Sequence, residues 1–302
     1  MAGLKELRSR IAAIKSTEKI TSAMKMVAAS RLRRAQDVLT KSEPYRTGVF
    51  ESVSRTMAAL RRQSKENDVE LIPSWICAEK PQQQRYLLVV LTSDKGLCGS
   101  YNHAIGKAAT ARIEELKSLG KDVQVVCLGH RGYNILKRHY ADLIVRNDVS
   151  VVNQGVEYCE AVSLADEIIA LFNGDKIDVC EIVYSRFKSA LSRDIVSEQV
   201  LPFDVTKIET GVDDMNGNAY YEAEPGNVKL LETTIPMAFK EFIFDIMINS
   251  QASEQGARMT SMDNATRNAG DMISKLTLRY NRLRQTAITT ELTEIIAGAE
   301  AI

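Results

Sequence analysis

Two long segments of helix-forming sequence, one at each end of the chain, constrain this fold more than any other feature. The first 43 of the 302 residues contain no proline and one glycine, and the 66 residues from Met237 onward contain no proline and three glycines. Proline and glycine are the residues that most destabilise a helix interior. Both segments can therefore form helices far longer than the average of about 11 residues, and the second could extend about 90 Å.

Apolar residues in both segments recur at helical spacing. Near the start Leu4, Leu7, Ile11 and Ile14 follow a three-four-three pattern, and the stripe continues through Ile20, Met24, Val27, Leu32, Ala35 and Leu39. Near the end a similar stripe runs from Phe239 to Ala287, with many small side chains between Gln251 and Ala269. Antiparallel pairing would bury both stripes. We therefore expect residues 1–62 and 236–302 to form a long antiparallel coiled coil.

The middle of the chain has a different pattern, in which short apolar runs alternate with helical stretches. The alternation predicts an α/β domain over 77–205 with a parallel or mixed sheet. The expected strands are Arg85–Thr92, Val123–Leu128, Val179–Tyr184 and Ile195–Phe203, and the expected helices are Asn102–Leu119, Arg131–Tyr140 and Glu160–Phe172. A connecting loop is expected over 206–235, of which Glu209–Gly226 is a solvated loop or short hairpin, and Pro44 permits a break or kink.

Composition excludes several classes of protein. The 39 basic and 39 acidic residues cancel, which gives no argument for nucleic-acid binding, and 45% hydrophobic residues argue against a disordered chain. The five cysteines are far apart, and we interpret them as reduced thiols in an intracellular compartment. The apolar runs are too short to cross a bilayer. The basic start resembles a transit peptide, but acidic residues interrupt it, so we expect it to be mature structure.

The glycine-containing segment Thr92–Asn102 occupies the position of a phosphate-binding loop, directly after a strand and before a helix. Its glycines, Gly96 and Gly99, do not have the spacing of either nucleotide-binding motif. We interpret it as a strand-to-helix turn that exposes Lys95, which could pair with a carboxylate on another protein. The three histidines show no metal or triad spacing, so we expect no catalytic residues, cofactor or metal.

The last residues form an apolar tip that includes Ile295, Ile296, Ala299 and Ile302. Because a frayed terminus is normally polar, such a tip favours insertion into a protein sleeve. A tip folded back on its own domain is the plain alternative.

Three separated motifs give the chain a resemblance to the gamma subunits of F-type ATP synthases. They are Ile20–Ser30, Ser93–Gly99 and Ile288–Ala301, and the likeness extends through Met259–Asn268 and Leu276–Gln285. The resemblance implies a shaft of paired terminal helices beside a central α/β (Rossmann-like) domain. It also implies a role without catalysis, as the central rotary shaft that couples transmembrane proton flow to conformational cycling of catalytic beta subunits.

The same resemblance implies partners and contact residues. The partners are the alpha and beta subunits, an epsilon-type subunit and the ring of c subunits, with no nucleic acid. Arg284 and Gln285 are expected to contact the beta catch loop, Lys95 a beta carboxylate, and Met24 with Lys25 a moving beta lever. The implied location is peripheral, on the cytoplasmic face of a bacterial inner membrane, with the matrix side of the mitochondrial inner membrane as the alternative. From the residues alone, a coiled-coil scaffold with an α/β head is the competing interpretation, and a nucleotide-dependent enzyme ranks lower.

Overall fold

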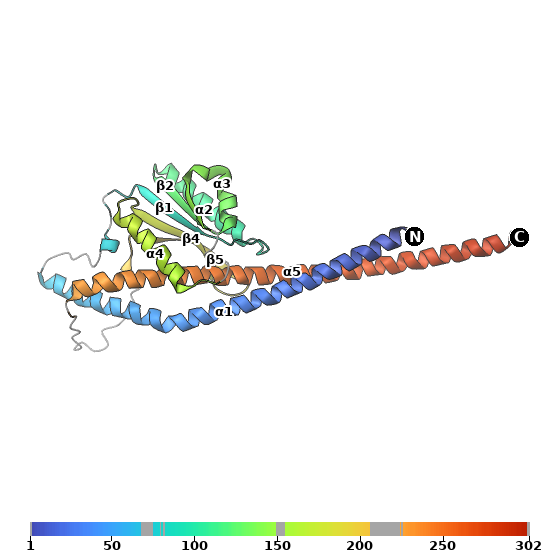
Figure 1. Ribbon diagram of the computed structural model, residues 1–302, viewed down its shortest axis with the longest axis horizontal. Coiled ribbons are helices and arrows are strands. Elements are labelled where there is room, and N and C mark those ends of the chain that lie inside the picture. Colours follow the sequence, from blue (N-terminus) through green and yellow to red (C-terminus); the bar gives the residue numbers. More distant parts are fainter. Residues whose placement is uncertain are drawn as a thin grey trace. The chain divides into compact units, whose positions relative to one another are not determined.

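The computed structural model describes residues 2–67, 75–78, 80, 82–148, 155–205, 224 and 226–300. Two long helices, α1 (Ala2–Asn67) and α5 (Asn227–Glu300), precede and follow an α/β region in the sequence, and most of its elements are labelled in Figure 1. The chain divides into two compact units. The first combines Met1–Ser30 with Arg258–Ile302, and the second contains Arg31–Ala257.

A five-stranded mixed sheet forms the centre of the second unit. Its strands are β1 (Arg85–Leu91), β2 (Asp122–Leu128), β3 (Ile144–Asp148), β4 (Val179–Phe187) and β5 (Arg193–Leu201), in the order β3-β2-β1-β4-β5. The first four are parallel, and β5 is antiparallel to β4. The prediction of an α/β domain with a parallel or mixed sheet is therefore confirmed.

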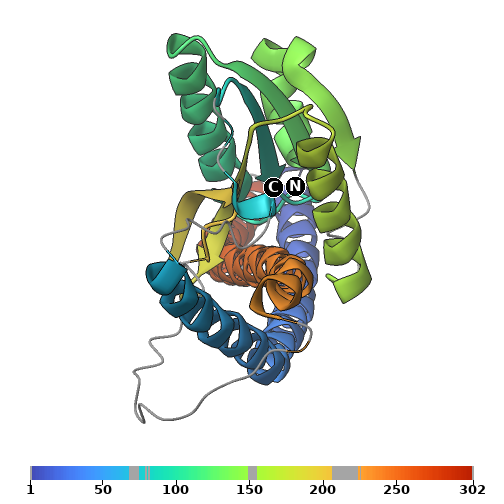
Figure 2. The same ribbon diagram turned by 90° about the vertical axis from the view of Figure 1, so that its left-hand side faces the viewer.

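Helices cover both faces of this sheet. They are α2 (Tyr101–Ser118), α3 (His130–Tyr140) and α4 (Tyr158–Asn173), with short 3₁₀ turns at Trp75–Cys77 and Ala141–Leu143. Figure 2 shows α2 and α4 on opposite sides of the strands. This follows from right-handed crossovers, because the strand order reverses after β3. The β1 and β4 side chains are mostly buried, as expected for parallel strands covered on both faces.

Helix α5 begins earlier than the sequence indicates. The predicted loop over 206–235 is wrong for residues 227–235, which are helical, and Pro236 lies inside the helix. The reason is packing: Leu231, Ile235 and Phe239 recur at helical spacing and are fully buried. That burial outweighs the hydrogen bond that Pro236 cannot donate. Most of the predicted loop or hairpin at Glu209–Gly226 lies outside the described residues.

Two further differences concern α1 and the sheet edge. Helix α1 passes through Pro44 and continues to Asn67, so Pro44 does not end it. Strand β3 was not expected from the sequence, because Ile144–Asp148 is short, half polar and partly exposed. Such a composition is normal for an edge strand, which packs on fewer neighbours than a central one.

In the first unit, side-chain contacts show that α1 and α5 are antiparallel. Lys25 Nζ lies 2.5 Å from Asp263 Oδ1, and Thr266 Oγ1 donates a hydrogen bond of 2.8 Å to Thr21 Oγ1. Farther along, a Cβ placed on Gly270 would lie 3.6 Å from Glu18 Oε1. The α1 numbers fall as the α5 numbers rise, so the antiparallel pairing predicted from the two stripes is confirmed.

In the second unit, α5 packs against both α1 and the α/β elements. Asp245 forms an ion pair with Arg46 of α1. The Tyr101 hydroxyl, buried at the start of α2, lies 2.8 Å from Ser250 Oγ. A Cβ on Gly256 would lie 3.4 Å from the Ala190 carbonyl oxygen in the β4–β5 turn. The first half of α5 is therefore part of the α/β unit.

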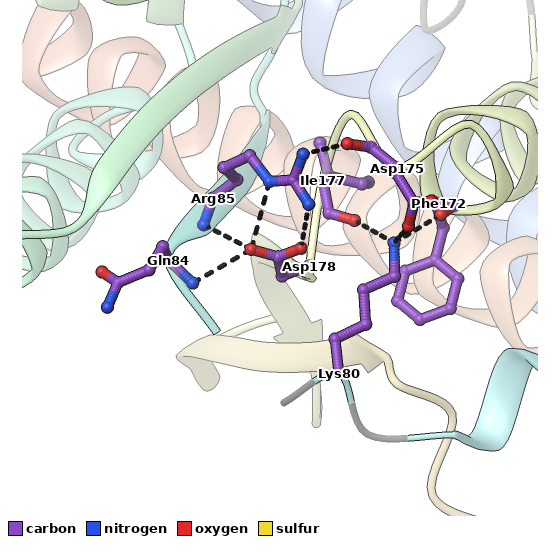
Figure 3. A network of polar contacts seen from close by, with 7 residues as sticks. All are labelled: Lys80, Gln84, Arg85, Phe172, Asp175, Ile177 and Asp178. Carbon is purple, nitrogen blue, oxygen red and sulfur yellow. Dashed lines mark hydrogen bonds and ion pairs between the residues drawn. The ribbon is translucent and has the colours of Figure 1, made fainter. Parts of the chain in front are cut away.

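The amino ends of β1 and β4 are joined by a buried carboxylate (Figure 3). Asp178 Oδ2 accepts hydrogen bonds from the backbone N–H groups of Gln84 and Arg85, at 3.0 and 2.9 Å, while Asp178 Oδ1 accepts one of 2.6 Å from the Arg85 guanidinium. Asp178 is 1% exposed. The Arg85 hydrogen bond is the largest of the effects that lower the Asp178 pKa to about 2. The carboxylate thus stays ionised and fixes both strands.

Lys80 fastens the end of α4 to the same region (Figure 3). Its Nζ donates hydrogen bonds to the carbonyls of Phe172 and Ile177, at 2.7 and 3.0 Å, and pairs with Asp175 at 2.7 Å. The same ammonium lies 4.5 Å from the centroid of the Phe172 ring. A cation at the last carbonyls of a helix is favourable because they carry the negative end of its dipole.

Candidate protein-contact site

The loop that carries Lys95 is a rigid strand-to-helix turn. Ser93 N donates a hydrogen bond of 3.0 Å to Asn102 Oδ1, and Ser93 Oγ donates one of 2.7 Å to the Lys95 carbonyl. Leu97 and Gly99 both have positive φ, at 68° and 59°. The predicted turn is thereby confirmed. Its internal hydrogen bonds fix the backbone that carries the exposed Lys95 side chain.

The neighbouring turn is held against this loop by glycine. Gly129 has φ of 111°, and a Cβ there would lie 2.2 Å from the carbonyl oxygen of Thr92. Gly132 N donates a hydrogen bond of 2.9 Å to Thr92 Oγ1. Only glycine permits such a close approach at positive φ. The ends of β1 and β2 are therefore joined directly behind Lys95.

Leu97 is a contact candidate that the sequence reasoning missed. It is 58% exposed at the tip of the same loop as Lys95. The sequence feature that could have indicated it is an apolar residue that lies between Gly96 and Gly99 in a turn, where no buried core position is expected. An exposed leucine beside an exposed lysine is suited to a protein surface that offers both an apolar patch and a carboxylate.

In the first unit, Lys25 is half-exposed and already paired within the chain. Its partner Asp263 also pairs with Arg267, at 2.5 Å. The Lys25 hydrogen bond is the main cause that lowers the Asp263 pKa. Met24 is half-buried. Any contact of Lys25 with another chain must share the ammonium with Asp263.

Part of the predicted buried stripe on α1 is exposed. Ile20 and Val27 are 57% and 54% exposed, and Met26 is 64% exposed, whereas Ala28, Leu32 and Ala35 are buried. The expectation that Ile20 and Val27 face the helix seam is wrong, because the drifting pattern turns them away from α5. Three exposed apolar side chains in so short a segment are a second feature suited to contact with another protein.

Near the other end, Arg284 and Gln285 are both exposed on α5. Beyond them Ile288, Leu292, Ile295 and Ile296 are between 51% and 69% exposed, at a spacing that places them along one side of the helix. Ala299 is also exposed, and Ile302 lies outside the described residues. The described part of the tip therefore exposes apolar side chains along one side of α5.

The candidate contact residues form separate groups. Met24 with Lys25, Arg284 with Gln285, and the Ile295–Ala299 tip belong to the first unit, while Lys95 belongs to the second. Among the described residues, no cluster of histidine, cysteine and carboxylate side chains is suited to hold a metal ion. Within the same residues, no helix is long and apolar enough to cross a membrane. All five cysteines have free thiols.

Comparison with known proteins identifies the class and then the family. A family model described as ATP synthase matches residues 3–302. The chain is 44% identical to the ATP synthase gamma chain of Rhodospirillum rubrum and 46% identical to that of Erythrobacter litoralis, and each alignment covers all of both chains. The fold and its comparisons thus place the chain among ATP synthase subunits. Within that class it belongs to the ATP synthase gamma-chain family.

Solved structures agree with the fold. A chain from the mitochondrial ATP synthase of Euglena gracilis, in an assembly of OSCP, F1 and c-ring, is 16% identical with a TM-score of 0.62, and the match covers 99% of this chain and 94% of that one. A chain from the central stalk and c-ring of the Tetrahymena thermophila enzyme is 24% identical with a TM-score of 0.58, covering 82% and 99%. At these identities the likeness supports the fold alone.

Proposed function

We propose that this chain is the rotating shaft of an F-type ATP synthase, which couples proton flow to conformational cycling of the beta subunits and performs no catalysis itself. The observation that carries the proposal is the antiparallel pairing of the first and last segments, locked by the Lys25–Asp263 pair and the Thr21–Thr266 hydrogen bond. A shaft must resist bending, and two paired helices do so better than one. Family membership favours this role over the scaffold interpretation.

The contact residues act by differential binding. Coupling requires that the shaft contact neighbouring beta subunits unequally, because a ligand shifts an equilibrium only through its different affinity for the two states. Arg284 and Gln285 supply donors for a beta catch loop, Lys95 for a beta carboxylate, and Met24 with Lys25 a contact for a beta lever. Exposed ion pairs are each worth about 1 kcal/mol or less. Such contacts can be broken and remade at every step.

The proposed partners are the alpha and beta subunits around the paired helices, and an epsilon-type subunit and the c-ring at the α/β domain. The exposed apolar stripe through Ile295 and Ile296 would turn inside a sleeve made by the alpha and beta subunits. The proposed location is peripheral, on the cytoplasmic face of a bacterial inner membrane. Purification of the tagged chain under mild detergent tests the partners. An alpha/beta ring and c subunits should accompany it, and their absence from the purified complex would contradict the shaft.

Arg284→Ala in the assembled complex tests the coupling role. We expect ATP hydrolysis to continue while ATP-driven proton pumping falls several-fold, since Arg284 is exposed and contributes little to this chain's own fold. Proton pumping is measured in inverted vesicles as fluorescence quenching of a pH-sensitive dye, and it is divided by the rate of ATP hydrolysis of the same vesicles. Lys275→Ala, an exposed basic residue on the same helix, is the control. Equal pumping-to-hydrolysis ratios in wild type and Arg284→Ala would count against the assignment.

A further inference from the structure

An apolar pocket of about 360 Å³ lies in the second unit, where α1, α4 and α5 meet. Its volume falls in the range of small-molecule sites. The walls that matter here come from three helices: Val38, Lys41 and Tyr45 from α1, Tyr158 from α4, and Glu241 and Phe244 from α5. None of these residues belongs to the contact groups assigned above.

Three aromatic rings line the pocket. Tyr158 and Phe244 meet edge to face, with ring centroids 5.2 Å apart and planes at 82°. Tyr45 and Tyr158 are 54% and 40% exposed, which is high for tyrosines that meet inside a fold. All three of Tyr45, Tyr158 and Glu241 line the pocket, and burial, followed by the effects of Tyr45 and Glu241, raises the Tyr158 pKa. Aromatic faces carry negative potential and attract cations.

Glu241 adds a carboxylate to this aromatic wall. The residue is only 2% exposed, and among the contacts of the described residues it has no hydrogen bond or ion pair. Arg46, the nearest cation that acts on it, is engaged by Asp245. Burial, followed by the Asp245 charge, raises the Glu241 pKa. Burial makes the charged form of this carboxylate costly, and a cation in the pocket would offset that cost.

Lys41 is the one cationic residue among those that line the pocket, and it does not neutralise the Glu241 carboxylate. Its side chain is exposed, so water and salt screen its charge. Glu241 is only 2% exposed, so its field is screened less. The side of the pocket formed by the aromatic rings and Glu241 therefore favours a positive ligand with apolar substituents.

We propose that this pocket binds an organic ammonium ion, with its methyl or methylene groups against Tyr45, Tyr158 and Phe244 and its charge facing Glu241. The proposal goes beyond the shaft function and does not depend on it. Quaternary ammonium groups suit the site best because they bury alkyl surface and need no hydrogen-bond acceptor. Inorganic cations would gain nothing from the apolar walls.

Choline and its uncharged isostere 3,3-dimethylbutan-1-ol are a matched pair of probes. The full-length chain is titrated with each at pH 8, and binding is followed by ligand-detected NMR. We expect saturable binding of choline with a dissociation constant about tenfold or more below that of the isostere. Equal affinities, or no saturable binding of choline, would overturn the proposal.

Two variants assign the binding to this pocket. Glu241→Gln should weaken choline binding about tenfold and leave the isostere unchanged, since it removes only the charge. Tyr45→Leu, at an exposed position, keeps apolar contact but removes one ring, and should weaken choline more than the isostere. Glu232→Gln, an exposed carboxylate on the same helix, is the control. Circular dichroism checks each fold, and wild-type choline affinity in either pocket variant would refute the site.

Discussion

We expect a substitution at the buried Asp178 to lower the free energy of unfolding strongly, although the side chain is small. It is buried and accepts hydrogen bonds from two backbone N–H groups and the Arg85 side chain. In Asp178→Asn an amide group replaces one acceptor oxygen and Arg85 loses its charged partner. We expect the free energy of unfolding to fall by about 2–3 kcal/mol, measured by urea denaturation at pH 7. Asp175→Asn, at an exposed position, should change it by less than about 0.5 kcal/mol.

The same residue predicts a pH dependence. Its folded-state pKa is about 2, below the value of about 3.9 for an unfolded aspartate. The Asp178 contribution is therefore complete above about pH 5 and is lost as the pH falls through 4 towards 2. The difference in unfolding free energy between wild type and Asp178→Asn should be constant from pH 8 to 5 and shrink below pH 4. A difference that grows on acidification would be incompatible with this assignment.

At this scale the sequence indicates exposed contact residues better than buried polar ones. Lys95 was predicted to be exposed because it lies in a strand-to-helix turn, and it is exposed. The roles of Asp178 and Glu241 could not be predicted from the sequence, because the residues around them come from distant positions in the chain. No rule of sequence spacing links such positions. Lys25 was expected to face another chain, and nothing in the local sequence indicated Asp263 as its partner.

At the scale of elements, Pro44 offers a simple test of the continuous α1. It is exposed and lies inside the helix, where a proline costs one hydrogen bond and a steric clash. Pro44→Ala should raise the free energy of unfolding of the second unit by about 1–3 kcal/mol. The adjacent exposed substitution Glu43→Ala should change it by less than about 0.5 kcal/mol. An unchanged or lower urea midpoint for Pro44→Ala would indicate that the helix breaks there.

The register of the two helices can be tested by cross-linking. Because Thr21 and Thr266 are in contact through their hydroxyls, Thr21→Cys with Thr266→Cys should form a disulfide on mild oxidation. The pair Thr21→Cys with Thr277→Cys, displaced by three helical turns, should not. Cys159, the exposed native thiol, is replaced by serine in both. Electrophoresis without reductant reads the result, and equal cross-linking of both pairs would rule out a fixed register.

Most elements could be predicted because hydrophobic periodicity and local composition agree in them. The four predicted strands and three short helices lie within a few residues of the observed ones. The failures occur where tertiary contacts decide. Strand β3 lacks a buried run and depends on pairing with β2. Residues 227–235 are helical because Leu231 and Ile235 are buried by other elements, although Pro236 argues against a helix.

For the molecule as a whole, the exposed apolar stripe of α5 makes a prediction about assembly. Ile295→Ser with Ile296→Ser removes apolar surface that is already in water in the isolated chain, so the fold should be unchanged by circular dichroism. The double variant should assemble with alpha and beta subunits several-fold less efficiently, measured by the yield of purified complex. Thr289→Ser with Thr293→Ser, at exposed positions on the same helix, is the control. A yield of purified complex equal to that of the wild type would contradict the proposal that the tip inserts into a sleeve of alpha and beta subunits.

The first compact unit is built from the two segments that are farthest apart in the sequence. During synthesis on the ribosome, residues 1–30 emerge well before their partner, 258–302. The early segment must therefore wait with its apolar side chains uncovered until that partner has been made. A truncated product would leave that segment permanently without its partner, which makes this region the natural place for chaperones and proteases to detect an unfinished chain.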